Sequence, residues 1–175
     1  MSPHDVPIPR DTRYVLLPSP DRLLCAIQGH LDDRTEVAGW ARRLGCLYRA
    51  WITDAASGKQ IRAEIGQVIG TIDAWISGQL PRPVPGSPRG ADSVGGVIAR
   101  VAEAWACAYW ALHENDDPLQ RHRAWDHLAE MREGYADLVR QVQHGAIILP
   151  KSWPSIGWPG LKPSGKDLLR RRDSS

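Results

Sequence analysis

"SVGGVIARVAEAWACAYWAL", residues 93–112, decides the fold class. Its apolar side chains recur at intervals of three and four residues, at Val94, Val97, Ile98, Val101, Trp105, Ala108, Tyr109 and Leu112. This spacing places them on one face of an α-helix. Asp92 or Ser93 can cap the first turn, because a short acidic or hydroxyl side chain accepts hydrogen bonds from its unpaired amides. The stretch therefore predicts an amphipathic helix whose apolar face lies in a core.

The next stretch, "HENDDPLQRHRAWDH" at residues 113–127, holds three histidines and four acidic residues in fifteen positions. Such a density would suit a metal or an acid–base site. However, Asp116 or Asp117 before Pro118 is typical of a helix start. Once that helix is running, His122 and Asp126 lie four residues apart and can face each other. The Glu-x-x-His spacing of di-iron bundles is missing from the apolar stripes. We therefore predict a turn and a helix cap, with no metal and no cofactor.

The same three-and-four spacing predicts the other helices. One should open at Asp117 and Pro118 and end near Gly145, with a core stripe of Trp125, Leu128, Met131, Tyr135, Leu138, Val139 and Val142. Upstream, a short helix should start at the Ser19 cap with Pro20 and end near Gly29, and a second should run from Thr35 to about Thr53. A third should carry the stripe Ile61, Ile65, Val68, Ile69, Ile72, Trp75 and Ile76.

Glycine and proline mark the remaining features of the chain. Gly66 and Gly70 lie inside the third long helix, where they indicate either close approach of another backbone or a tolerated defect; we favour the defect slightly. Residues 80–91, "LPRPVPGSPRGA", cannot continue a helix and predict a crossover loop. The short "AIILP" at 146–150 is expected to pack the chain back on the helices.

Together these elements predict an all-α fold: a helical bundle of four main amphipathic helices plus a short N-terminal helix. The expected organisation is an extended, Pro-rich N-terminal arm at residues 1–18, the bundle at 19–149 and a basic, Trp- and Pro-containing C-terminal tail at 150–175. A chain of 175 residues suits one such domain.

Cysteine usage and hydropathy indicate the cell compartment. Cys25, Cys46 and Cys107 lie far apart within apolar helical patterns, so we expect buried free thiols and a reducing cytoplasm. The first twenty residues lack the apolar core of a signal peptide, and no later stretch approaches the roughly 18 apolar residues of a membrane span. We therefore expect a cytoplasmic protein with no membrane contact.

The tail is the predicted contact element. It carries six Lys or Arg against two Asp, a charge of +4 within a total of +2. Trp153 and Trp158, each followed by proline, lie in a segment that cannot be helical, so their indoles either pack on the bundle or bind a partner. Arg170, Arg171 and Arg172 could pair with phosphates, or could simply keep the end solvated. A protein partner or a second copy is favoured, with nucleic acid as the alternative.

A polar pocket between helices is the competing site. Asp73 and Arg100 border apolar stripes, where they could form an ion pair across the bundle or a polar spot in a pocket. His122 and Asp126 complete the candidate set. No serine-centred turn, phosphate loop or cysteine with a nearby base is present, so no catalytic residue is assigned.

Three motifs carry a resemblance to a known family. They are Ile72-Asp73 on a helix, Gly96 to Arg100 after a Pro-rich loop, and the closing Gly134 to Val139. Over about residues 60 to 150 the chain resembles the uncharacterised bacterial helical family called domain of unknown function 4254. The resemblance implies a helical fold and a cytoplasmic setting, and it implies no reaction.

Two functions remain in competition. The favoured hypothesis is a non-catalytic binding or regulatory protein that uses the bundle as a scaffold and the tail as a contact. The alternative is an enzyme or small-ligand binder with a pocket at the four polar residues named above. Stoichiometric metal in the purified protein would favour the alternative.

Overall fold

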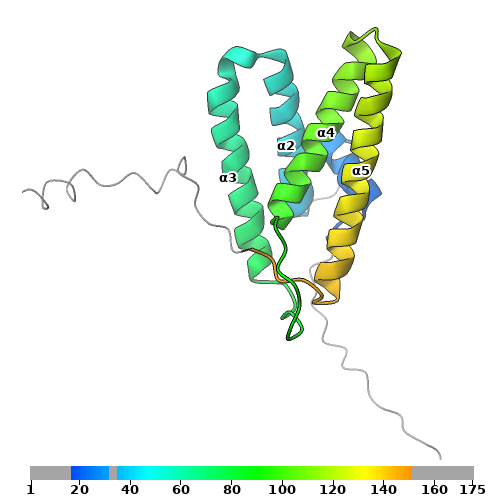
Figure 1. The fold of residues 1–175 in the computed structure, drawn as a ribbon. Helices are drawn as coiled ribbons and strands as arrows, with labels where there is room; N and C mark the ends of the chain where they lie inside the picture. The colour runs from blue at the N-terminus through cyan, green and yellow to red at the C-terminus, as the bar shows by residue number, and fades with distance from the viewer. Residues whose placement is uncertain (1–16, 32–34, 151–175) are drawn as a thin grey trace, which may run out of the picture.

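The computed structural model describes residues 17–31 and 35–150, which form an all-α bundle (Figure 1). Its helices are α1 (Pro20–Gln28), α2 (Glu36–Thr53), the short 3-10 helix η1 (Ala55–Ser57), α3 (Gly58–Ser77), α4 (Val94–Glu114) and α5 (Pro118–Gln143). Within these ranges there is no strand, only an isolated bridge between Arg89 and Ile148. The predicted fold class is confirmed. The arm up to residue 16 and the tail from residue 151 lie outside the described residues.

The helices begin where the capping residues predict. The Ser19 hydroxyl accepts a hydrogen bond from the Arg22 amide at the start of α1 (3.4 Å). Ser93, rather than Asp92, caps α4 by accepting from the Gly96 amide at 3.1 Å. Asp117 accepts from the Leu119 amide at 2.9 Å and opens α5. Local side-chain chemistry thus defines these three helix starts.

Helix α4 is the centre of the fold. It contacts each of the other four α-helices, whereas α5 packs on α4 and α1, and α3 packs on α2 and α4. About half of the α4 residues are buried. Figure 1 shows two antiparallel hairpins, α2–α3 and α4–α5, lying side by side. We call the end with the α2–α3 and α4–α5 turns the tip, and the opposite end, with residues 78–93 and 144–150, the base.

Two glycines, Gly45 and Gly95, allow helices to pack closely. A Cβ on Gly45 of α2 would overlap the carbonyl oxygen of Ile27 in α1. A Cβ on Gly95 of α4 would lie 2.6 Å from the carbonyl oxygen of Ile69 in α3. Gly66, in contrast, faces open space, so it is the tolerated defect. Close backbone approach occurs at α1–α2 and α3–α4.

At the base, the segment after α5 is held by the Pro-rich loop. The Ile148 amide donates to the Pro88 carbonyl, and the Gly90 amide donates to the Ile148 carbonyl, both at 2.9 Å. Ile147 and Leu149 pack against the core. The expectation that "AIILP" packs back on the bundle is confirmed, and its main partner is the loop at residues 80–91.

Several predicted core positions are wrong. Trp105 and Leu138 are buried, as predicted, but Tyr109 (40% exposed), Leu112 (47%) and Trp125 (43%) are not. These three lie near the tip, beyond the part of the bundle that α1 covers. The expectation of buried thiols is also wrong for two cysteines: all three are free, but Cys46 and Cys107 are exposed and Cys25 is half-buried.

Candidate interaction surface

Asp73 and Arg100, two residues of the predicted pocket, both lie at the base and do not pair with each other. The Asp73 carboxylate accepts a hydrogen bond from the Gly95 amide at 2.8 Å. Arg100 forms an ion pair with Asp92, just before α4. A carboxylate beside the first turn of a helix stabilises it, because the unpaired amides there carry partial positive charge. Asp73 is thus a second cap for α4, supplied by α3.

His122 and Asp126, the other two pocket residues, form an exposed pair at the tip. The His122 Nε2 atom lies 3.1 Å from the Asp126 Oδ2 atom, one helical turn along α5. Helix α4 spans 21 residues, about 30 Å at the usual rise, and separates this pair from Asp73. The structure therefore divides the four predicted residues between opposite ends of the bundle. They do not converge on one pocket.

The interior offers little polar chemistry. In residues 17–31 and 35–150, no polar or charged residue other than tyrosine is fully buried. Over the same residues, no three His, Cys, Asp or Glu side chains lie close enough together to hold a metal ion. The distinctive chemistry of the described chain lies on its surface.

A group of large side chains is exposed on one side of the tip. We call it the tip surface and define it as Arg49, Ile52, Tyr109, Leu112 and Trp125. Ile52 is 37% exposed, and the other apolar members are more exposed still. Exposed apolar side chains that lie together on one side of a protein are candidates for an interaction site. The group combines three helices, α2, α4 and α5.

Helical geometry places the α2 members on the side of the bundle that carries α1. Arg49 and Ile52 follow Gly45 by four and seven residues, so all three share one face of α2. That face contacts Ile27 of α1 through Gly45. Arg49 and Ile52 therefore continue, toward the tip, the surface that α1 covers lower down.

The same argument applies to α5 and α4. Trp125 precedes Arg132 by seven residues, and the Arg132 guanidinium pairs with Asp21 of α1 at 2.6 Å. Tyr109 and Leu112 follow the buried Trp105 by four and seven residues. The α2 and α5 members thus point to the α1 side, and Tyr109 of α4 joins them because the Arg49 guanidinium lies over its ring.

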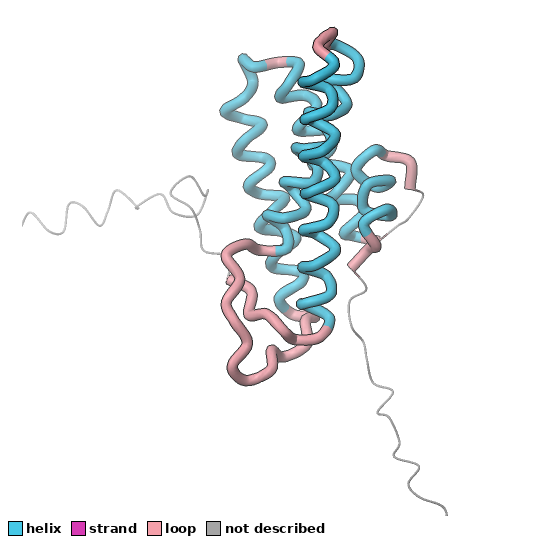
Figure 2. Tube along the Cα trace, turned by 45° about the vertical axis from the view of Figure 1, so that its right-hand side comes forward, coloured by secondary structure: helices cyan, strands magenta, loops and turns pink. Residues whose placement is uncertain are grey.

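The shortness of α1 explains why these residues are uncovered. With nine residues it is about 14 Å long, less than half the length of α4. Figure 2 shows α1 against the middle of the bundle, with the tip extending beyond it. The apolar stripes of α4 and α5 continue toward the tip, where α1 no longer covers them and residues such as Leu112 and Trp125 are partly exposed.

Arg49 supplies the positive charge of the tip surface. Its guanidinium carbon lies 5.1 Å from the Tyr109 ring centroid and 5.9 Å from that of Trp105. The His113 ring lies 4.4 Å from the Tyr109 ring. Among the described residues, no carboxylate pairs with Arg49. An arginine held over aromatic rings keeps the capacity to bind an acidic group.

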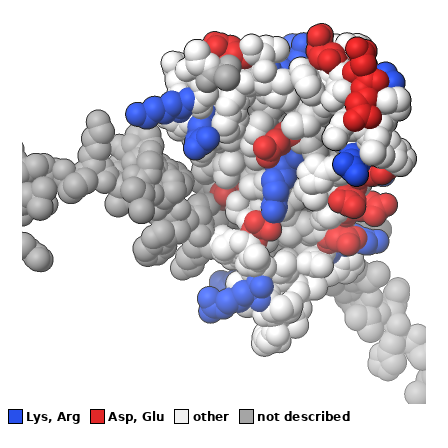
Figure 3. Space-filling model, turned by 45° about the horizontal axis from the view of Figure 1, so that its top comes forward, with Lys and Arg blue, Asp and Glu red and all other residues white. Residues whose placement is uncertain are grey.

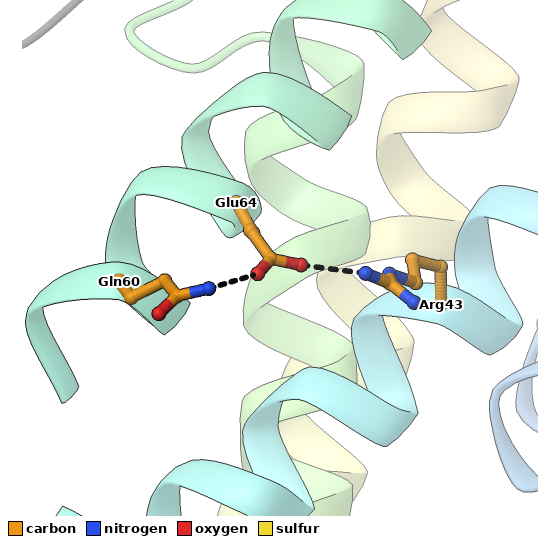
Figure 4. A network of polar contacts seen from close by, with 3 residues as sticks. All are labelled: Arg43, Gln60 and Glu64. Atoms are coloured by element: carbon orange, nitrogen blue, oxygen red, sulfur yellow. Dashed lines mark hydrogen bonds and ion pairs between the residues drawn. The ribbon is translucent and has the colours of Figure 1, made fainter. Parts of the chain in front are cut away.

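Neighbouring contacts hold the α2–α3 hairpin in place. Tyr48 and Trp51 stack at 6.2 Å, and Arg62 of α3 lies over the Trp51 ring at 5.2 Å. Lower down, the Arg43 guanidinium and the Gln60 amide both contact the Glu64 carboxylate, at 2.5 and 3.4 Å (Figure 4). The α2 side of the tip surface therefore rests on a hairpin that these contacts hold together.

The side of the bundle away from α1 has a different character. Figure 3 shows Lys and Arg side chains interspersed with Asp and Glu over this face. Mixed charges of this kind are typical of solvated surface. The tip surface differs from this face in combining exposed apolar side chains with an arginine held over an aromatic ring.

Sequence reasoning missed this surface. The apolar spacing predicts core positions for Tyr109, Leu112 and Trp125, and it does not mark Arg49 or Ile52 as surface contacts. A length comparison could have found it, because the predicted first helix is too short to cover the stripes of residues 93–112 and 118–142. The predicted contact residues Trp153, Trp158 and Arg170 to Arg172 lie outside the described part of the chain.

Comparison of the chain with protein-family models, curated proteins and solved structures found no match in any of the three. The resemblance to domain of unknown function 4254 therefore rests on its sequence motifs alone. None of the helices in the described ranges has the length and apolar character needed to cross a lipid bilayer.

Proposed function

We propose that this chain is a non-catalytic binding or regulatory protein whose bundle presents the tip surface to a protein partner. The observation that carries the proposal is the exposure of Tyr109, Leu112 and Trp125. They lie near the tip, beyond the part of the bundle that the short helix α1 covers. Burying such groups against a partner would remove apolar area from water, which is the main driving force of association.

The residue types of the tip surface also suit binding. Tryptophan, tyrosine and arginine are the types that most often dominate the energy of protein interfaces. Trp125 and Tyr109 provide broad apolar rings with a polar edge, and Arg49 provides a charged centre. A partner with apolar side chains around a carboxylate would complement this arrangement.

The remaining parts of the proposal concern the setting. We propose a cytoplasmic location, supported by three free cysteines, and a kinship with domain of unknown function 4254, supported by its three motifs. The basic tail with Trp153 and Trp158 is a second proposed contact, with a protein favoured over nucleic acid. No described feature favours the pocket alternative, because its four residues lie at opposite ends of the bundle.

The experiment begins with a photo-reactive amino acid in place of Leu112 in the full chain. Irradiation in the native cells identifies the neighbouring protein, which is then purified for isothermal titration calorimetry. Leu112→Asp should weaken its binding by about tenfold or more, as loss of a central contact does. The control Leu119→Asp changes a leucine that is even more exposed but lies on another face of α5, and it should leave the affinity unchanged. Equal affinity of both variants and the unaltered chain would overturn the proposal.

A further inference from the structure

We propose that residues 1–16 of the same chain occupy the tip surface when no partner is bound. The inference rests on the proposed function, because the protein partner and residues 1–16 would bind the same surface in turn. It makes the N-terminal arm an intramolecular competitor of the partner. The argument depends on where the described chain begins, how far the arm reaches and which side chains it carries.

The described chain begins on the correct side of the bundle. Leu17 is buried, and the Pro18 carbonyl accepts a hydrogen bond from the Tyr135 hydroxyl of α5 at 2.8 Å. Asp21 pairs with Arg132 one turn closer to the tip. The arm therefore joins the bundle beside α5, on the side that carries α1 and the tip surface.

The arm is long enough to cover the surface. Trp125 lies ten residues before Tyr135 on α5, or about 15 Å along the helix. About five extended residues span that distance. Crossing from α5 over α4 to α2 adds two interaxial distances of about 8–10 Å each, or roughly six more residues. Eleven of the sixteen residues suffice to bring the arm from Leu17 to Arg49.

The side chains of the arm complement the surface. Its apolar residues are Val6, Ile8, Tyr14, Val15 and Leu16. Asp5 and Asp11 provide carboxylates for Arg49, which has none among the described residues. Three prolines restrict the chain to few conformations, which lowers the entropy lost when an extended segment binds.

The C-terminal tail is the less favourable occupant. It leaves the bundle at the base, where Ile148 is hydrogen-bonded to the Pro-rich loop. From there it would have to extend along a bundle about 30 Å long before reaching the tip surface. A longer closed loop costs more entropy, so the nearer arm is favoured.

Competition gives the surface a means of regulation. An arm bound to the tip surface lowers the apparent affinity of the partner by the fraction of molecules that are closed. Weakening the arm should therefore strengthen partner binding. This is the opposite of the result expected when Leu112 itself is changed.

The test uses the full chain with benzoylphenylalanine at position 112, irradiated at low protein concentration. Trypsin cleaves after Arg10 and Arg13, so mass spectrometry can locate the attachment within the arm. We expect cross-links to residues 1–16 in a species of monomer mass. The same probe at position 119 should not reach the arm. Ile8→Asp should reduce the yield severalfold, whereas Ser2→Asp should not.

Three other results would overturn the inference. Cross-links in a species of dimer mass would assign the surface to a second copy of the chain. Cross-links to residues 151–175 would assign it to the tail, and no intrachain product would leave it open to solvent. Arm cross-links without a Leu112→Asp effect on partner affinity would refute the proposed function alone. The converse result would refute only the inference about the arm.

Discussion

The single side chain of Arg49 connects the α2–α3 hairpin to the α4–α5 hairpin. Its guanidinium extends from α2 over the rings of Trp105 and Tyr109 in α4. We predict that Arg49→Met, which keeps the apolar stem, lowers the free energy of unfolding by about 0.5–1 kcal/mol through loss of the cation–π contacts. Urea denaturation measures the change. The matched control is Arg123→Met, which changes an exposed arginine of α5 and should leave the free energy of unfolding unchanged. Equal effects at the two positions would show that the ring contacts of Arg49 add no stability.

Tyr48 and Tyr135 make the stability of the fold depend on pH in the alkaline range. Burial raises the pKa of Tyr48 to about 12, with smaller contributions from Glu103 and Cys107, and burial also raises the pKa of Tyr135. A raised pKa means that the folded state favours the neutral phenol. This stabilisation is therefore complete below the unfolded pKa of about 10 and is lost as pH rises toward 12.

We accordingly predict that the free energy of unfolding falls between about pH 10 and pH 12. Chemical denaturation at several pH values measures the fall, and the double variant Tyr48→Phe, Tyr135→Phe should reduce it. At neutral pH, Tyr135→Phe alone should cost about 0.5–1.5 kcal/mol, because the Pro18 carbonyl loses its hydrogen bond. An unchanged pH profile in the double variant would contradict the assignment.

The role of a side chain was predictable from the sequence where its hydrogen-bonding partner is close along the chain. Ser19 and Asp117 cap amides two or three residues away, so their positions before a proline were sufficient. The role of Asp73 was not predictable, because the amide it binds is 22 residues distant, across the Pro-rich loop. Its boundary position suggested a partner in space without identifying it.

At the scale of elements, helix bounds followed from periodicity, but the depth of burial did not. A stripe shows which face of a helix is apolar. It does not show how far along the helix a neighbour extends. The stripes therefore predict core positions for Tyr109 and Trp125, although α1, with nine residues, ends before it can cover them.

The glycines of α2 and α3 provide a test at the same scale. Gly45→Ala should destabilise the protein, because its Cβ would overlap the Ile27 carbonyl and push α1 away. Gly66→Ala should instead stabilise it by about 0.5–1 kcal/mol, because Gly66 is exposed within a helix and has open space around it. Thermal melts of both variants compare them directly. A destabilised Gly66→Ala protein would show that α3 packs differently from the structure.

At the scale of the whole molecule, alternating helix directions separate the predicted pocket residues. Asp73 lies near the end of α3 and Arg100 near the start of α4, so the antiparallel arrangement of these helices places both at the base. His122 and Asp126 lie near the start of α5, at the tip. The α2–α3 and α4–α5 connections are short, so the sequence implies antiparallel hairpins there and a position for His122 and Asp126 at a hairpin turn. The exposed surface on the α1 side was harder to predict from the sequence, because it depends on which helices α1 packs against.

A final prediction separates core from surface across the bundle. Trp105→Ala should cost about 3–5 kcal/mol, because Trp105 is buried in α4, which contacts every other α-helix. Trp125→Ala removes the same indole from the tip surface and should cost about 1 kcal/mol or less, because much of that ring already faces water. Calorimetric unfolding of the two variants measures the contrast. If Trp125→Ala proved as costly as Trp105→Ala, the tryptophan would be a structural anchor, and the tip surface would lose its largest binding group. A small cost combined with weaker partner binding would fit an indole that contributes to recognition more than to folding.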